Sequence, residues 1–184
     1  MTPFDVEGAL KTATVLVDTR EQDTLRARRR LHDIGLPIER TALNFGDYSI
    51  KCSALDLSNS VAIERKMDLN ELCDCYGKGR GRFKREFERC KAANAKLYLL
   101  VENGSWEKVY SGGYRSRMSS ESLRASMFAW LARYNCQIIF CEAKLSGQMI
   151  RDILMRELRE RLMGMIDEET QIQTDGHAQS AGPL

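Results

Sequence analysis

The segments GDYSI at residues 46–50 and VAIERK at residues 61–66 decide the fold and the chemistry that we expect for this chain of 184 residues. Both segments are rich in apolar and β-branched residues, which predicts neighbouring strands. Alternate side chains of a strand face the same side, so Glu64 and Lys66 are expected together on one face. In an antiparallel hairpin, Asp47 at the start of the first strand would reach the same edge of the sheet.

Two carboxylates and a lysine that converge at the end of a sheet are suited to phosphodiester hydrolysis. Asp47 and Glu64 offer the hard oxygen atoms that Mg²⁺ prefers. Such a metal acidifies a bound water and stabilises charge on the reacting phosphate. Lys66 can orient that water or neutralise the developing charge.

A third segment, VDTRE at residues 17–21, ends another expected strand upstream. Its Asp18, Arg20 and Glu21 would lie alongside the pair of carboxylates and add acidic groups and a phosphate-binding arginine. An isolated E-x-K pattern on an exposed strand is common, and aspartate after glycine is ordinary turn chemistry. The prediction therefore depends on the three segments occurring together and in this order.

The remaining sequence predicts an α/β domain with a mixed central sheet and helices on both faces. Apolar runs predict strands at residues 14–18, 38–43, 46–52, 60–66, 96–103 and 136–141. Apolar residues at helical spacing predict helices at residues 24–34, 68–76, 83–95, 120–134 and 145–162.

The chain length suggests one domain, which we expect to span residues 13–166. Residues 1–12 are interpreted as an N-terminal extension. Residues 167–184 are polar and lack periodicity, so a disordered tail is predicted there.

Composition excludes several classes of protein. No apolar run approaches the roughly 18 residues of a membrane span, and the N-terminus lacks the features of a secretory signal. Six cysteines occur, but without the spacing of a zinc site, so we expect free thiols in a reducing cytoplasm. With only two histidines, far apart at His32 and His177, metal sites or nucleophiles built on histidine are not expected.

The combination of these segments resembles the nuclease domain of the XPF family, which belongs to the restriction-endonuclease-like superfamily. The core motif of that family, G-D-Xn-E-R-K-X3-D, is matched by Gly46, Asp47, Glu64, Arg65 and Lys66. The V-D-x-R-E that precedes the motif is matched by residues 17–21. The resemblance covers residues 13–162 and looks most like the compact versions found in bacteria and their phages.

The resemblance implies a restriction-endonuclease-like fold and a structure-specific DNA endonuclease that uses Mg²⁺ or Mn²⁺. By motif position, Asp47 and Glu64 would be metal ligands, with Asp18 assisting the metal site. Lys66 would be the catalytic lysine, and Arg65 would contact or stabilise phosphate.

The sequence departs from the family in two respects. The last aspartate of the motif is replaced by Asn70, which keeps an oxygen atom but loses the charge. No counterpart of the helix-hairpin-helix domain of the eukaryotic and archaeal members is expected, because only the predicted tail follows residue 166. Selectivity for DNA junctions would then come from elsewhere, such as a partner protein or a homodimer.

The formal net charge of +2 gives no argument for DNA by itself, but the positive charge is concentrated. Residues 78–91 hold seven lysines and arginines against two glutamates, and the glycine-spaced part of this segment would form a mobile loop that approaches phosphate. A second candidate surface is the loop at residues 114–117. The predicted DNA-binding residues are Arg20, Lys78, Arg80, Arg82, Lys84, Arg85, Arg115 and Arg117. A solvated helix face and an ordinary surface loop are the alternatives for these two regions.

We therefore expect a metal-dependent endonuclease that cuts branched or flapped DNA in repair or recombination. The predicted catalytic residues are Asp47, Glu64, Arg65, Lys66, Asp18 and Glu21. One alternative is a catalytically inactive DNA-binding subunit that pairs with an active nuclease. Another is an enzyme that degrades DNA without structural preference.

Overall fold

The computed structural model describes residues 2–180, without the side chains of residues 3, 4 and 168–180. In this part of the chain, six strands form one sheet. The strands are β1 (Thr14–Asp18), β2 (Ile38–Thr41), β3 (Tyr48–Lys51), β4 (Val61–Lys66), β5 (Lys96–Glu102) and β6 (Cys136–Cys141). Each strand lies within a segment for which the sequence predicts one.

The sheet is mixed, with the strand order β2-β1-β3-β4-β5-β6. β1 is parallel to β2 and antiparallel to β3, while β4, β5 and β6 are parallel to one another. β3 and β4 are antiparallel, with Tyr48 opposite Ile63. The α/β class, the mixed sheet and the antiparallel pairing of the two motif strands are therefore confirmed.

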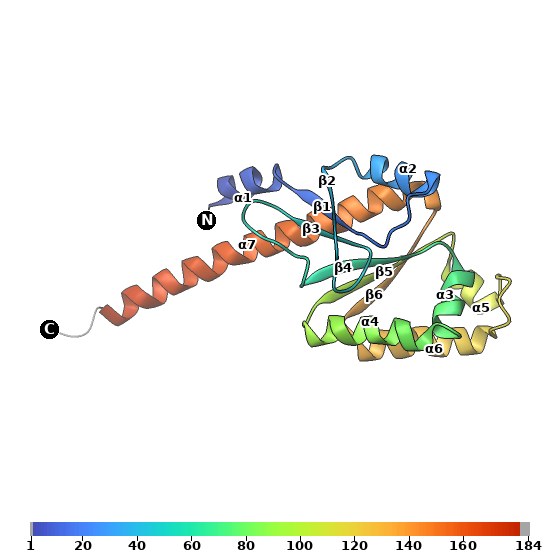
Figure 1. Ribbon diagram of the computed structural model, residues 1–184. Coiled ribbons are helices and arrows are strands. Elements are labelled where there is room, and N and C mark those ends of the chain that lie inside the picture. Colours follow the sequence, from blue (N-terminus) through green and yellow to red (C-terminus); the bar gives the residue numbers. More distant parts are fainter. Residues whose placement is uncertain (1, 181–184) are drawn as a thin grey trace.

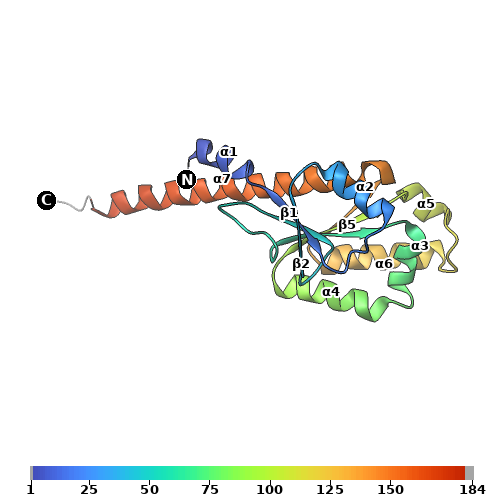
Figure 2. The ribbon, with the colours of Figure 1, turned by 45° about the horizontal axis from the view of Figure 1, so that its top comes forward.

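Helices cover both faces of the sheet (Figure 1). One face carries α1 (Pro3–Leu10), α2 (Leu25–Ile34) and α7 (Ser146–Ser180), and a short 3-10 turn, Ala143–Leu145, precedes α7. The other face carries α3 (Leu69–Tyr76), α4 (Arg80–Ala92) and α6 (Ser120–Arg133), with α5 (Trp106–Ser111) beside α6. The tilted view in Figure 2 shows the same two layers.

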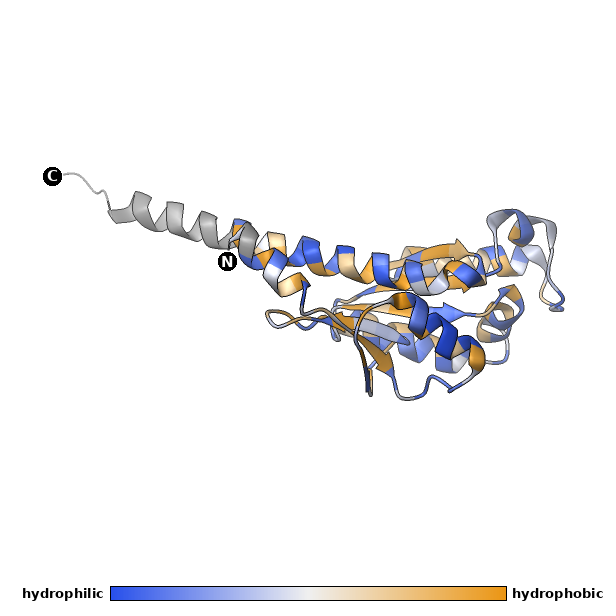
Figure 3. Ribbon diagram, turned by 90° about the horizontal axis from the view of Figure 1, so that it is seen from above, coloured by the Kyte–Doolittle hydropathy of each residue, from blue (hydrophilic) through white to orange (hydrophobic). Residues whose placement is uncertain are grey.

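Each layer of helices buries its own apolar core against the sheet. Hydrophobic and hydrophilic residues alternate along the long helix α7 (Figure 3). The core under α3, α4 and α6 centres on Trp130, whose ring lies 5.0 Å from that of Tyr76 and 5.8 Å from that of Phe87. Burial of one such side chain stabilises the fold by about 1.5–3 kcal/mol. This core fixes α3 and α4, which supply part of the candidate site.

The helix ends follow the local sequence. Thr24 and Asp68 accept hydrogen bonds from backbone N–H groups at the starts of α2 and α3, and Gly35 ends α2 in the left-handed conformation. Ser119 caps α6 in the same way. These caps explain why the expected boundaries of α2, α3 and α6 agree closely with the structure.

The two ends of the chain differ from expectation. Residues 3–10 form α1, whose Val6 and Leu10 are buried in the core shared with α7, so this segment packs as part of the domain. Residues 167–180 continue α7 rather than forming the irregular tail that the sequence predicts. Extending an existing helix needs no new nucleus, so a polar stretch can remain helical without apolar periodicity. Residues 181–184 of the predicted tail lie outside the described residues.

The glycine-spaced basic segment also differs from the mobile loop that we expected. α4 begins at Arg80, so Gly81 and Arg82 belong to its first turn. Only residues 77–79 connect α3 to α4, and a Cβ atom on Gly79 would lie 3.2 Å from the carbonyl oxygen of Asp74. Close packing of the two helix ends therefore fixes the segment.

All six cysteines are free thiols, as the sequence predicts, and four of them are buried. Within residues 2–180, none of the helices combines the length and the apolar character that crossing a lipid bilayer requires.

Candidate active site

The glycine before Asp47 determines where the Asp47 carboxylate lies. Gly46 has φ +72°, and a Cβ atom there would come within 2.7 Å of the Ala62 side chain on β4. This close approach lets the Asp47 N–H donate to the carbonyl oxygen of Ile63 at 2.8 Å. In return, Oδ2 of Asp47 accepts a 2.8 Å hydrogen bond from the Arg65 N–H. The Gly-Asp pair thus fixes a carboxylate beside the end of β4.

Glu64 and Lys66 lie on the same face of β4, as predicted, and both are almost fully buried. Nζ of Lys66 forms an ion pair with Oε1 of Glu64 and lies 3.9 Å from Oε1 of Glu71. The ring of Phe83 lies below this ammonium, 5.3 Å from Nζ to the ring centroid. The lysine is therefore held between carboxylates and an aromatic ring.

The electrostatics of the site reflect carboxylates crowded in a buried place. Burial, together with the nearby carboxylates of Glu21 and Glu86, raises the pKa of Asp47 to about 6, although Lys66 and the Arg65 N–H act to lower it. Burial and the nearby charge of Asp47 also raise the pKa of Glu64. Burial alone would lower the pKa of Lys66, but these carboxylates raise it above its ordinary value. Lys66 thus remains charged among acids that ionise reluctantly.

Two adjoining cavities of about 350 and 360 Å³ open over these residues, and we call them together the catalytic cavity. Both are lined by Glu64, Lys66, Glu71, Arg82 and Glu86. The first is also lined by six further residues: Arg20, Glu21, Gln22, Asp47, Arg65 and Arg89. Most of the predicted catalytic residues are therefore brought together.

A divalent cation fits the donor set of this cavity. Within the described chain, Oδ1 of Asp47 and Oε2 of Glu64 have no hydrogen-bond partner, so each carboxylate keeps one oxygen atom for a ligand. Mg²⁺ is typically bound by one or two carboxylates and completes its octahedron with water. Among the described residues, no group of three or more His, Cys, Asp or Glu has the geometry of a metal site. The fit is therefore with two carboxylates and water.

Asp18 is not brought into the catalytic cavity. Its side chain is buried and accepts hydrogen bonds from the N–H groups of Arg20 and Leu43, both at 2.8 Å, and from the Arg20 guanidinium at 2.6 and 3.1 Å. Burial would raise the pKa of Asp18, but these hydrogen bonds outweigh it and lower that pKa. The structure gives Asp18 the task of orienting Arg20, which does line the cavity.

Glu21 and Arg65 belong to a buried network of charges around Arg30. Nη1 of Arg30 donates to Oε1 of Glu21 at 2.8 Å, and Nε of Arg30 lies 3.2 Å from Oε1 of Glu102. The other carboxylate oxygen of Glu102 lies 3.5 Å from Nη1 of Arg65. The Arg65 side chain is thus directed to Glu102, and its main-chain N–H is the group that contacts Asp47.

Two further acids that the sequence analysis did not place in the site line the catalytic cavity. Oε1 of Glu86, on α4, accepts a 2.9 Å hydrogen bond from the Gly46 N–H. Oε2 of Glu71 accepts from the Met67 N–H at 2.7 Å. The only sequence signal for Glu86 is its position three residues after the buried Phe83, on the inner side of α4.

The predicted DNA-binding residues separate into three groups. Arg20, Arg82 and Lys78 line the catalytic cavity. Lys78 also lines a second cavity together with Arg115 and Arg117. The remaining three point elsewhere: Arg80 stacks over Trp130, 5.3 Å from its ring, and Lys84 and Arg85 are exposed on α4 outside these cavities.

Comparisons with known proteins identify the family of this chain. The sequence matches the family model of the ERCC4 domain over residues 17–153, more than half of the chain. The chain therefore belongs to the ERCC4 domain family, the XPF-type nuclease domains, and the resemblance read from the sequence is confirmed. A search of curated proteins gave no match.

Two solved structures of XPF from Aeropyrum pernix, one of them in complex with DNA, share the fold. Each superposes with a TM-score of 0.57 and 22% sequence identity. The matches cover 78% and 80% of this chain, and 61% and 66% of the XPF chains. This chain thus corresponds to less than two thirds of the length of either XPF chain.

Proposed function

We propose that the protein is a metal-dependent, structure-specific DNA endonuclease that hydrolyses phosphodiester bonds in branched or flapped DNA, in repair or recombination. The observation that carries the proposal is the convergence of Asp47, Glu64 and Lys66 in one cavity at the β3–β4 edge. Membership of the ERCC4 domain family and the DNA complex of the XPF neighbour support DNA as the substrate.

Asp47 and Glu64 would hold Mg²⁺ or Mn²⁺, which supplies Lewis-acid chemistry and a more acidic bound water. Lys66, charged and held by Glu64 and Phe83, is positioned to orient the attacking water or to neutralise charge on the phosphate. Arg20 and Arg82 line the same cavity and can pair phosphate oxygens. Asp18 would act through Arg20, whose guanidinium it holds.

The test uses purified protein with Mg²⁺ or Mn²⁺ and a panel of labelled DNAs: flap, splayed-arm, nicked, four-way and linear. We expect cutting of branched substrates, and we expect Lys66→Ala to abolish cutting while DNA binding is retained. Equal cutting of every substrate would favour degradation without structural preference. DNA binding without cleavage of any substrate, with either Mg²⁺ or Mn²⁺, would contradict the proposed nuclease activity and favour an inactive DNA-binding subunit.

We also propose a cytoplasmic setting and a second protein chain, either a copy of this one or a partner, that contributes to substrate selection. The six free thiols suit a reducing compartment. Sedimentation of the purified protein with and without flap DNA tests the proposal of a homodimer.

A further inference from the structure

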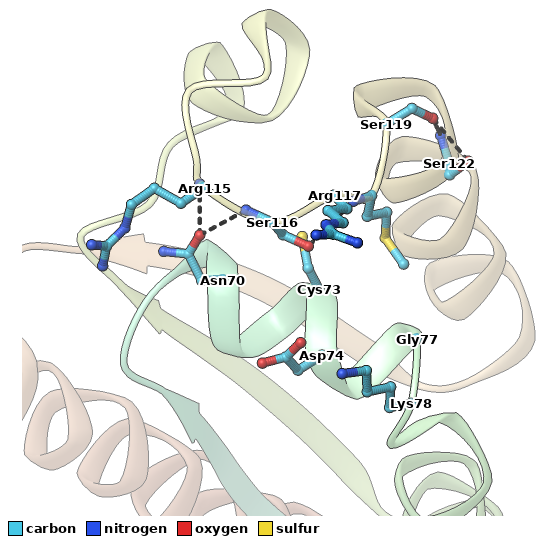
Figure 4. Close-up of a pocket in the computed structure, with 11 residues that line it drawn as sticks. Asn70, Cys73, Asp74, Gly77, Lys78, Arg115, Ser116, Arg117, Ser119 and Ser122 are labelled. Carbon is cyan, nitrogen blue, oxygen red and sulfur yellow. Dashed lines mark hydrogen bonds between the residues drawn. The ribbon is translucent and has the colours of Figure 1, made fainter.

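A further cavity near the site lies between α3 and the loop that leads into α6, and we call it the loop cavity (Figure 4). It measures about 860 Å³, and Asp74 and Lys78 line both it and the catalytic cavity. A chain that leaves the catalytic cavity past the end of α3 would therefore enter the loop cavity directly.

Positive charge in the loop cavity is unpaired. Lys78, Arg115 and Arg117 are exposed, and none of the three side chains forms an ion pair or a hydrogen bond within the described residues. The one carboxylate in the lining is that of Asp74. Figure 4 shows Arg117 reaching over α3, while Arg115 extends on the opposite side of Asn70. Such free guanidinium groups favour phosphate, which they can pair in a bidentate way.

Asn70 ties the loop to the catalytic strand. Its Oδ1 accepts hydrogen bonds from the N–H groups of Arg115 at 2.7 Å and Ser116 at 3.1 Å. Its Nδ2 donates to Oδ2 of Asp68 at 3.1 Å. Asn70 lies in the first turn of α3, four residues after Lys66 at the end of β4, so the position of the two arginines is linked to that of the catalytic lysine.

We propose that the loop cavity binds the sugar–phosphate backbone of a single-stranded arm of DNA, and that Asn70 is the positioning residue of its arginine loop. The loop cavity continues from the catalytic cavity at Asp74 and Lys78, so a single strand whose phosphate lies in the catalytic cavity can continue into it. The backbone of a duplex is the alternative occupant, and the first experiment separates the two. None of the described residues that line the loop cavity is aromatic, so the arm is held by its phosphates, without base preference. This inference rests on the proposed function, because it assigns one part of the branched substrate.

The first experiment measures the affinity of a short fluorescent oligo(dT) and of a linear duplex by anisotropy in EDTA. We expect Arg117→Ala and Lys78→Ala each to weaken oligo(dT) binding by about 10-fold. Duplex affinity should stay nearly unchanged in Arg117→Ala, because Arg117 lines the loop cavity but not the catalytic cavity. The slope of log K against log salt should become shallower by about 0.7 for each phosphate that the variant no longer neutralises. Arg156→Ala is the matched control, because Arg156 is an exposed arginine on α7 that lines neither cavity.

The second experiment tests Asn70 through its two amide partners. Asn70→Ala should remove the protection of the Arg115 and Ser116 amides from hydrogen exchange and weaken oligo(dT) binding. Asn70→Asp retains the acceptor oxygen and should restore the protection of both amides. Oligo(dT) affinity that stays at the wild-type value in Asn70→Ala, with both amides unprotected, would overturn the positioning role.

The outcomes separate this inference from the proposed function. Wild-type protein that does not bind oligo(dT), or an equal loss of duplex and oligo(dT) affinity in Arg117→Ala, overturns the inference even if flap DNA is cut. Selective loss of oligo(dT) affinity supports the inference even in a protein that cuts no substrate, a result that would overturn the nuclease proposal alone.

Discussion

The carboxylate of Asp47 is held by the main-chain N–H of Arg65, at 2.8 Å, rather than by a side chain. The Arg65 side chain points to Glu102 instead. The type of side chain at residue 65 therefore does not determine where the predicted metal ligand Asp47 lies. What the arrangement requires is the close approach of the two strands at Gly46, where a Cβ atom would collide with Ala62.

Gly46→Ala is therefore expected to be strongly destabilising. It forces an unfavourable positive φ and adds a contact at 2.7 Å, so we expect a loss of about 2–4 kcal/mol in the free energy of unfolding. Gly112→Ala is the matched control, because Gly112 has the same φ of +72° and no atom within 4 Å of the added methyl group. Urea denaturation should give about 1 kcal/mol for the control. Equal losses in the two variants would contradict the steric argument.

Asp47→Asn should make the protein more stable and less active. The pKa of Asp47 is raised to about 6 in the folded protein, so its ionised form opposes folding. Asparagine keeps an acceptor for the Arg65 N–H and removes that cost. We expect a gain of about 1–3 kcal/mol above pH 6 that disappears below about pH 4, where the carboxyl is protonated in both states. Cleavage should fall by at least ~100-fold. Urea denaturation across this pH range checks the gain, and an unchanged free energy of unfolding at pH 8 would argue against crowding of the carboxylates.

Metal binding should be visible in stability as well as in activity. A ligand that binds only the folded state stabilises it by about 2.7 kcal/mol at a concentration of 100 times its Kd. Mg²⁺ or Mn²⁺ should therefore raise the melting temperature of the wild type, and EDTA should reverse the increase. The increase should be lost in Glu64→Gln and retained in Glu142→Gln, which removes an exposed carboxylate that does not line the catalytic cavity. A similar increase in all three proteins would indicate non-specific binding.

Glu157, on the face of the sheet opposite the catalytic cavity, is expected to make stability depend on pH in a different way from Asp47. It accepts a 2.6 Å hydrogen bond from Lys96 and further ones from Tyr98 and Arg161. Burial would raise the pKa of Glu157, but these donors outweigh it and lower that pKa. A carboxyl with a lowered pKa stabilises the fold above its unfolded pKa, near 4.3, and loses this contribution as the pH falls through its folded pKa.

Glu157→Gln should accordingly cost about 1–3 kcal/mol at pH 7, and the difference from wild type should shrink at lower pH. Thermal melts of both proteins between neutral and acidic pH measure this difference. A difference that stays constant across the range would show that the hydrogen bonds of Glu157 do not depend on its charge.

Much of the fold follows from local sequence. The strands are short apolar runs, which the composition of the sequence reveals. α2, α3 and α6 have apolar residues at helical spacing and begin at side chains that cap them, so the sequence also predicts these helices. α1 and α5 were missed, and α5 has only six residues. α1 is stabilised by packing of Val6 and Leu10 on the distant α7, which no local pattern records.

The candidate site was predicted only in part, because local patterns in the sequence do not record contacts between distant residues. Asp47, Glu64 and Lys66 follow from two strands and their alternation, whereas the contact of Glu86 with Gly46 joins residues 40 positions apart. The role of Asn70 depends on a loop 45 residues later in the chain. Asp18 was predicted to assist the metal site because it lies near the motif in the sequence. The sequence does not show that its oxygen atoms accept hydrogen bonds from Arg20 and Leu43 instead.

The contribution of α4 has a consequence for the order in which the chain is synthesised. A nascent chain that ends at Lys66 already contains every residue of the recognised motif, yet it lacks the ring under the lysine and the carboxylate that holds Gly46. Both come from α4, and α4 is in turn held by Trp130 on α6. The cavity is therefore completed only when most of the domain has left the ribosome and packed, so incomplete chains carry the motif without an assembled site.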